Sequence, residues 1–184
     1  MKHIATMALM LNLGVAGIYA QEKPVNMTFS GSNVATTIDL KNGTVTDEEI
    51  LAGKGTLGPF TYRELHADDP SQPSSTCSGP SALEVAGGGV FRFQDGSLLT
   101  LSLTQGALCI DPTVGVGHLT TTYQITGGTG RFKGASGNLT RTTTLVPVLF
   151  NAVTSFPALL TNTGKFEGTV LGVAIGEEVG SGNE

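Results

Sequence analysis

Charged residues are scarce in this chain, since Asp, Glu, Lys and Arg make up 14% of its 184 residues. Basic residues are the rarer sign: 10 lysines and arginines stand against 15 aspartates and glutamates, which gives a formal net charge of −5. An acidic surface repels nucleic acid, and no basic cluster offsets it, so nucleic-acid binding is excluded. The apolar residues are too many and too regularly spaced for disorder. Abundant Thr, Ser and Gly suit an extracellular β-protein whose surface is hydrated by hydroxyl groups.

Long hydrophobic runs are also lacking, apart from residues 4–19 behind Lys2 and His3. This run is shorter than the about 20 residues of a membrane-spanning helix and is interrupted by glycine. We interpret residues 1–20 as a signal peptide cleaved after Ala20, with an uncleaved anchor as the alternative. No cysteine follows the run, which argues against a lipoprotein. We therefore expect a secreted or periplasmic protein with no membrane span in the mature chain.

Removing Lys2 with the signal peptide leaves 9 basic against 15 acidic residues, a formal charge of −6. The length predicts one barrel domain over residues 21–172, followed by a flexible polar tail over 173–184.

Cysteine is nearly absent, because Cys77 and Cys109 are the only two in the chain. No Cys-x-x-Cys motif occurs, which argues against a redox function. Export would place both thiols in an oxidising compartment, so we predict that they form a disulfide. On the chain-entropy model such a bridge stabilises the fold by about 3–4 kcal/mol.

Alternation of apolar and polar residues with a period of two recurs along the whole chain and predicts an all-β fold. We expect a single antiparallel closed β-barrel of about eight strands, between residues 24 and 171, because closure removes exposed strand edges. Four local features complete this prediction. They are a hairpin turn at Asn42-Gly43, one helical turn opening at Asp47, a long Pro/Ser loop over residues 67–86 and a strand from Asn138 that Pro147 ends.

Five glycines crowd into residues 127–137, between two threonine-rich strands. Glycine allows the positive φ of a tight corner, and Phe132 is its one bulky apolar residue, so we predict that Phe132 is a buried plug. The segment lacks the Gly-Lys-Ser/Thr ending of a Walker loop and the following helix of a dinucleotide loop. The structural corner is expected to consist of Gly127, Gly128, Gly130, Phe132, Gly134 and Gly137.

The segment Ile125 to Gly137 resembles the Gly-Gly-Thr/Ser-Gly-x-Phe-x-Gly-x-x-Gly corner of plant dirigent proteins and allene oxide cyclases. Residues 53–61 and 166–169 are similar to strands of uncharacterised exported bacterial proteins that carry the same corner. The resemblance implies an eight-stranded, calycin-like barrel. It also implies a cavity that binds an apolar or phenolic substrate and steers a cyclisation or coupling.

Several charged or phenolic residues lie within predicted strands, and alternation places Tyr62 and Glu64 on one face and Arg63 on the other. A carboxylate facing an apolar interior would have a raised pKa and could act as an acid or base. We favour the alternative in which Glu64 and Arg63 face solvent, because unpaired charges are rarely buried. The catalytic candidates are Tyr62, Glu64, Tyr123 and Arg141, and Arg92 is a further charged residue in a predicted strand.

Other chemistries find less support. His66, Asp68 and Asp69 could hold a divalent cation, but acids at a loop entry more often turn the chain, and His118 is distant in sequence, so we predict no metal site. No Gly-x-Ser-x-Gly motif indicates a nucleophile. The Asn-x-Ser/Thr triplets at Asn26, Asn42 and Asn138 matter only in a host that glycosylates exported proteins.

Residues 148–160 form the most apolar segment of the mature chain and are either core, a lid or a partner surface. We expect a non-catalytic exported barrel, with no cofactor, that binds a small apolar ligand or a protein partner. A homo-oligomer is compatible with this expectation. The alternative is a dirigent-like or cyclase-like enzyme.

Overall fold

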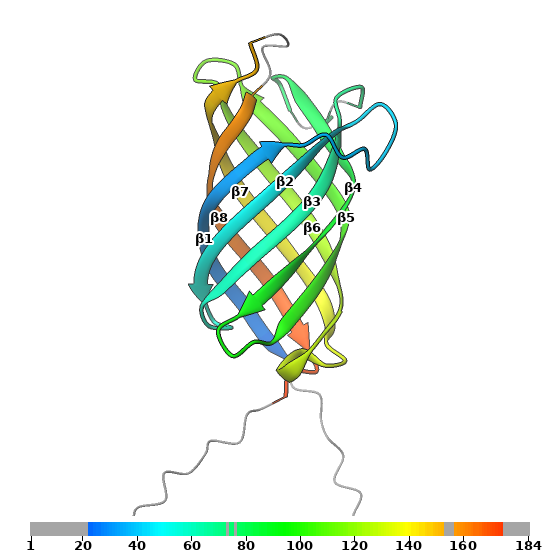
Figure 1. The fold of residues 1–184 in the computed structure, drawn as a ribbon, viewed down its shortest axis with the longest axis vertical. Helices are drawn as coiled ribbons and strands as arrows, with labels where there is room; N and C mark the ends of the chain where they lie inside the picture. Colours follow the sequence, from blue (N-terminus) through cyan, green and yellow to red (C-terminus); the bar gives the residue numbers. More distant parts are fainter. Residues whose placement is uncertain (1–21, 73, 76, 153–156, 175–184) are drawn as a thin grey trace, which may run out of the picture.

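The computed structural model describes residues 22–72, 74–75, 77–152 and 157–174. Their strands form one closed antiparallel barrel in which each strand pairs with its neighbours in sequence and β8 pairs with β1, as Figure 1 shows. The strands are β1 (Lys23–Ala35), β2 (Val45–Gly55), β3 (Phe60–Asp69), β4 (Ser81–Phe93), β5 (Leu98–Asp111), β6 (Val116–Gly128), β7 (Ser136–Phe150) and β8 (Pro157–Leu171). The predicted fold class is confirmed.

Because consecutive strands are antiparallel, the connections between them alternate between the two ends of the barrel. We call the end where β2–β3, β4–β5 and β6–β7 are joined the plug end, which is the lower end in Figure 1. The 3₁₀ turn η1 (Gly130–Phe132) lies there, and the Phe132 ring is fully buried, 4.8 Å from the Phe93 ring centroid. The opposite end, with the β1–β2, β3–β4, β5–β6 and β7–β8 connections, we call the loop end.

The glycine corner has the backbone that the sequence predicts. Positive φ values occur at Gly127 (136°), Gly130 (58°), Gly134 (76°) and Gly137 (129°), where side chains are disfavoured. Gly128 has a different role, since a Cβ atom there would collide with the Leu98 carbonyl oxygen and with Phe132. The corner therefore needs glycine for two reasons: positive φ at four positions and close packing at Gly128.

Aromatic rings fill the half of the barrel above the plug. Phe91 lies at ring-centroid distances of 5.1 Å from Phe60, 4.5 Å from Tyr62 and 4.9 Å from Phe166. Edge-on and tilted contacts at these distances are favourable beyond the burial of apolar area. The core of the barrel in this half consists of its own side chains.

Three local predictions are wrong, and strand pairing explains each. Asp47 does not open a helical turn but lies in β2, where ladders to β1 and β3 outweigh a single turn of helix. Pro147 does not end β7, because a register irregularity beside it removes the need for its missing N–H. The Pro/Ser loop is shorter than expected, since β3 continues to Asp69 and β4 starts at Ser81.

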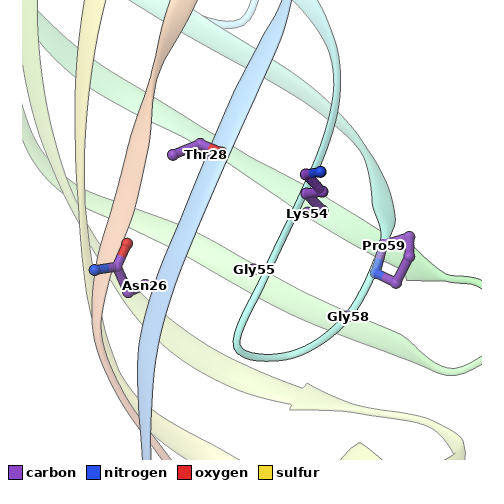
Figure 2. A pocket seen from close by; sticks show the side chains of 6 residues that line it. All are labelled: Asn26, Thr28, Lys54, Gly55, Gly58 and Pro59. Atoms are coloured by element: carbon purple, nitrogen blue, oxygen red, sulfur yellow. The ribbon is translucent and has the colours of Figure 1, made fainter.

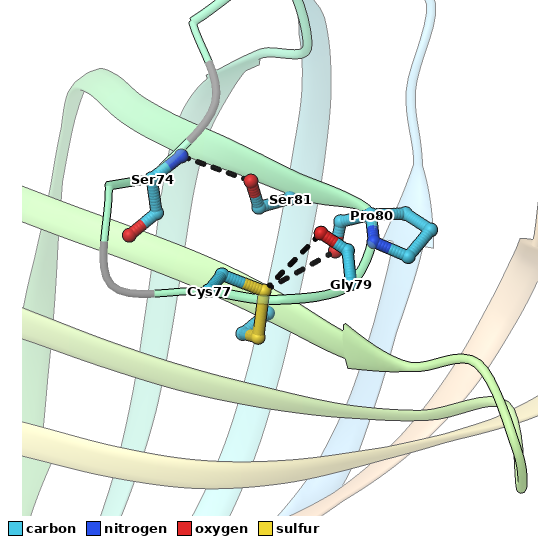
Figure 3. The surroundings of a disulfide bond; sticks show 6 residues. Ser74, Cys77, Gly79, Pro80 and Ser81 are labelled. Carbon is cyan, nitrogen blue, oxygen red and sulfur yellow. Dashed lines mark hydrogen bonds between the residues drawn. A yellow bond between two sulfur atoms is a disulfide. The ribbon is translucent and has the colours of Figure 1, made fainter.

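The predicted disulfide is present and ties this loop to β5. Cys77 and Cys109 are 5.6 Å apart between Cα atoms, and Figure 3 shows the bridge beside Gly79 and Pro80. Such a disulfide is compatible with an extracellular or periplasmic protein.

The predicted signal peptide at residues 1–20 lies outside the described residues, and only residues 173 and 174 of the predicted tail at 173–184 are described. The first residues of the tail are anchored, because Val173 packs on the core and the Ala174 N–H donates to the Arg131 carbonyl (2.9 Å). Across the described ranges, no helix has the length and apolar character needed to cross a bilayer.

Candidate functional site

The side chain of Glu64 faces the barrel interior, so the prediction that it faces solvent is wrong. Its exposed fraction is 2%, while Arg63 on the opposite face is 66% exposed at its side chain and pairs with Glu48. Alternation along β3 therefore holds, but Glu64 faces inward, because the barrel interior contains polar partners for its carboxylate. Those partners make burial of the carboxylate possible.

All four catalytic candidates meet inside the barrel. The hydroxyls of Tyr62 and Tyr123 donate to Glu64 Oε2 at 2.8 and 2.9 Å, and Arg141 Nη1 donates to the same oxygen at 2.8 Å. Arg92, by contrast, lies exposed on the outer face. Residues up to 79 positions apart thus converge because β3, β6 and β7 curve around one interior.

Two further carboxylates, Glu49 and Glu84, belong to this cluster, and no local feature of the sequence indicates them. Glu49 accepts a hydrogen bond from Arg141 Nη1 and one from the Asn162 amide. Glu84 accepts from Arg141 Nη2 at 3.2 Å and from the Thr121 hydroxyl at 2.5 Å. We call Glu49, Glu64, Glu84 and Arg141, with their phenol, hydroxyl and amide donors, the buried network.

Strand register would have identified these residues. Glu49 on β2 lies directly opposite Glu64. Glu84 on β4 lies opposite Gly106, which is paired with Thr121, and Thr121 lies opposite Arg141. Opposite residues of an antiparallel pair point to the same side of the sheet. Without the register, alternation alone does not reveal which glutamates face inward.

Burial is the main cause of the shifted pKa values in and beside the buried network. Burial raises the pKa of Glu64 to about 7, although its two tyrosine donors lower it, and burial raises the pKa of Glu84 well above its usual value. Burial also lowers the pKa of Arg141 to about 9 and that of His66 to about 4. The phenol pKa values of Tyr62 and Tyr123 are raised by burial and by the nearby Glu64 charge.

A second polar group lies nearer the loop end. Asp47 on β2 is paired directly with His66 on β3, and Asp68 follows His66 by two residues on the same face. One ligand atom from each of the three lies within 4.8 Å of the others. Asp69 takes no part, because it accepts hydrogen bonds from Ser71 and Gln72 and turns the chain, as expected for an acid at a loop entry.

Two hollows on the described surface lie apart from the buried network, because none of its residues lines them. One, of about 480 Å³, lies on the outer wall beside the β2–β3 turn (Figure 2) and is lined by Asn26, Thr28, Lys54, Gly55, Gly58 and Pro59. The other, of about 400 Å³, lies across β6, β7, β8 and β1, and His118 is among its lining residues. Neither combines an enclosed apolar wall with converging polar groups, as small-molecule sites do.

Comparison with protein-family models and with curated proteins finds no match for this chain. A functional assignment therefore rests on the geometry and chemistry of the molecule itself.

Proposed function

We propose that this protein is an exported, non-catalytic binding protein whose loop end docks onto an apolar, positively charged segment of a partner protein. One observation carries this proposal: of the ten exposed large apolar residues in the described chain, eight lie at the loop end. We call them the apolar rim: Ile38, Leu40, Val45, Val114, Val146, Val148, Leu149 and Phe150. Gathered apolar side chains of this kind mark interaction sites, whereas single ones need no explanation.

The distribution of charge indicates the chemistry of the partner. Three aspartates accompany the apolar rim on the same connections and strand ends, namely Asp39, Asp69 and Asp111. Lys41 is the one lysine or arginine of the described loop-end connections, while Lys23, Lys54, Arg92, Arg131 and Lys133 lie toward the plug end. An acidic and apolar surface attracts a basic amphipathic segment and repels anionic lipid.

The filled interior favours binding at the surface over binding inside the barrel. Tyr62, Tyr123 and Arg141 are at most 1% exposed, and aromatic rings occupy the space between them and the plug. An interior ligand would have to displace these packed side chains.

A pair of model peptides tests the proposal. A fluorescent Leu/Lys amphipathic peptide should bind the full chain in an anisotropy titration, and a Leu/Glu peptide of equal length should not. Binding of the basic peptide should weaken as salt rises, because part of the attraction is electrostatic. The double variant Leu149→Ser/Phe150→Ser should weaken it by at least tenfold.

Ile50→Ser is the matched control, because Ile50 is 45% exposed on the outer wall of β2, away from the apolar rim. Equal binding of both peptides, or equal loss in the rim and control variants, would reject the proposal. Sedimentation of the peptide-free protein separates a competing outcome, in which the rim joins two copies of this chain.

A second candidate function is acid–base catalysis at Glu64, as the resemblance to dirigent proteins and allene oxide cyclases suggests. It is favoured by the position of the Glu64 carboxylate between two phenols and a guanidinium. Catalysis requires that substrate reach these groups. Titration with p-cresol, followed by NMR of the Tyr62 and Tyr123 rings, should shift both signals if a phenol enters, and unchanged signals at millimolar p-cresol would eliminate this candidate.

A further inference from the structure

The carboxylates inside the barrel exceed the positive charge available to them. Glu49, Glu64 and Glu84 surround the single guanidinium of Arg141, and Asp47 and Asp68 lie above them toward the loop end. Among the described residues, Arg141 is the one lysine or arginine that forms an ion pair with any of these five acids. A buried or half-buried carboxylate needs a cation or hydrogen-bond donors. Each of the three glutamates accepts at least two hydrogen bonds, whereas Asp47 and Asp68 have no lysine or arginine partner among the described residues and share a side-chain hydrogen bond with each other.

His66 lies between the two sets of acids without a hydrogen bond of its own. The imidazole is 1% exposed, and its Nε2 atom is 3.9 Å from Asp68 Oδ2 and 3.7 Å from Glu84 Oε1, too far for a hydrogen bond. Its Nδ1 atom and the Asp68 Oδ1 atom are buried without a hydrogen-bond partner in the described structure. Buried polar groups in this state usually indicate an absent water or ion.

These separations fit ligands that share one metal ion. Nitrogen and oxygen ligands lie about 2.0–2.2 Å from Zn²⁺ and similar ions, so two of them on one ion are about 3–4.4 Å apart. The Nε2 to Asp68 separation falls in this range, and the three ligand atoms of Asp47, His66 and Asp68 need only a small adjustment to enclose an ion. A mixed set of imidazole and carboxylates suits first-row transition metals better than Mg²⁺ or Ca²⁺, which prefer oxygen alone.

We propose that Asp47, His66 and Asp68 bind one divalent transition-metal ion near the loop end of the barrel. The strands fix the three ligands in advance, because Asp47 and His66 are opposite one another across β2 and β3. Glu84 also lies beside the imidazole, but its hydrogen bonds with Arg141 and Thr121 hold it in the buried network. Three protein ligands leave a coordination position open to water or to another molecule at the loop end.

The ion enters from the loop end, where the Asp68 side chain is 15% exposed and Asp47 is half-buried. This site is independent of the apolar rim. Peptide binding without metal binding would support the apolar rim and reject the metal site. Metal binding without peptide binding would support the metal site and reject the apolar rim.

Zn²⁺ titration of the full chain without an affinity tag, after treatment with EDTA, tests this proposal by calorimetry. We expect one ion per chain with a dissociation constant in the micromolar range or tighter. Asp68→Asn and Asp47→Asn should each weaken binding by at least tenfold, and Co²⁺ should give visible absorption bands of a nitrogen-ligated site that are lost in His66→Gln.

Two matched controls separate the site from general effects of substitution. Asp69→Asn changes the adjacent acid, and His118→Gln removes an exposed imidazole on β6; both should retain Zn²⁺ binding. Because His66→Gln alters a buried residue, the half-buried aspartates provide the decisive comparison, and circular dichroism checks that every variant is folded. Absence of stoichiometric binding in the parent chain, or equal binding in parent, Asp47→Asn and Asp68→Asn proteins, would overturn the proposal.

Discussion

Arg141 is the residue on which the interior of the barrel depends most. Its guanidinium is fully buried and donates to three glutamates that come from three different strands, β2, β3 and β4. Such ion clusters contribute little net stability compared with an apolar core, but removal of one partner leaves the others as uncompensated charges. Arg141 therefore connects β7 to the opposite wall of the barrel.

Replacing Arg141 by Met should lower the free energy of unfolding by about 3–5 kcal/mol at pH 8, because three carboxylates lose their cation. Urea denaturation followed by circular dichroism measures this loss. Arg63→Met is the control, since Arg63 is exposed and paired with Glu48 on the outer face, and should cost less than about 1 kcal/mol. Equal small losses in the two variants would show that the buried network does not depend on its arginine.

Gly89 supports the same network by having no side chain. A Cβ atom at this position would overlap the ring and hydroxyl of Tyr62, which is fully buried among aromatic rings. Tyr62 has little room to move, because Phe91 and Phe166 pack on it.

Gly89→Ala should therefore destabilise the barrel by about 1–3 kcal/mol, as overpacking of a filled core does. The measurement is a chemical denaturation curve. Gly117→Ala is the matched control, since its Cβ would meet only the side chains of Leu108 and Leu145 at 3.1–3.4 Å, and it should cost clearly less. The order of the two losses is the decisive result, and a reversed order would contradict the role assigned to Gly89.

At the scale of elements, the β6–β7 corner closes one end of the barrel. The Arg131 guanidinium lies 4.8 Å from the Phe93 ring centroid and 4.7 Å from that of Phe132, so it covers the plug from outside. Its Nη2 atom also donates to the Leu57 carbonyl on the β2–β3 turn at 2.5 Å. The corner thus joins three turns of the plug end.

Phe132→Ala should cost about 3–5 kcal/mol in the free energy of unfolding, the range for emptying a buried phenylalanine site. Phe150→Ala removes the same side chain where it is 61% exposed and should change stability by about 0.5 kcal/mol or less. Thermal and chemical denaturation of both variants decides the matter. A negligible loss in the Phe132 variant would mean that the corner holds without its plug.

The corner and the disulfide were predictable from sequence because each depends on local chemistry. Glycines that allow positive φ and two cysteines in an exported chain are visible without knowing the partners of a strand. The helical turn at Asp47 was predicted wrongly for the same reason. Acids at the start of a short segment favour a helix locally, but β2 gains ladders on both sides.

At the scale of the whole molecule, closure of the barrel creates what local sequence cannot show. Arg141 and Glu49 are 92 residues apart in sequence yet in direct contact. Alternation assigned Tyr62 and Glu64 to one face, but β3 carries a charged residue on each face, Arg63 and Glu64, so the sequence did not distinguish the inner face from the outer. Asp47, the third residue of the proposed metal site, was missed because its position beside His66 depends on the β2–β3 register.

Closure also gathers titratable groups whose protonation opposes unfolding in a defined pH range. The interior contains Asp47, Glu49, Glu64, Asp68 and Glu84 with Arg141, His66, Tyr62 and Tyr123 around them. Burial raises the pKa of Glu64 to about 7, and burial together with the Asp47 charge raises that of Asp68 to about 8. In the unfolded chain both carboxyl groups titrate near 4.

Stability should therefore rise as pH falls from 8 to 6, because the folded protein takes up protons that the unfolded chain does not bind in this range. His66 acts in the opposite direction only where its unfolded form becomes charged, near pH 6.5 and below, since burial lowers its folded pKa to about 4. We expect a gain in the free energy of unfolding on the order of 1–3 kcal/mol between pH 8 and 6.

Urea denaturation at constant ionic strength, with EDTA present, measures this gain without a contribution from metal. Glu64→Gln and Asp68→Asn should each reduce this gain, and Glu167→Gln on the outer wall should leave it unchanged. A flat or falling stability between pH 8 and 6 in the parent chain would show that these carboxyl groups are already compensated inside the barrel.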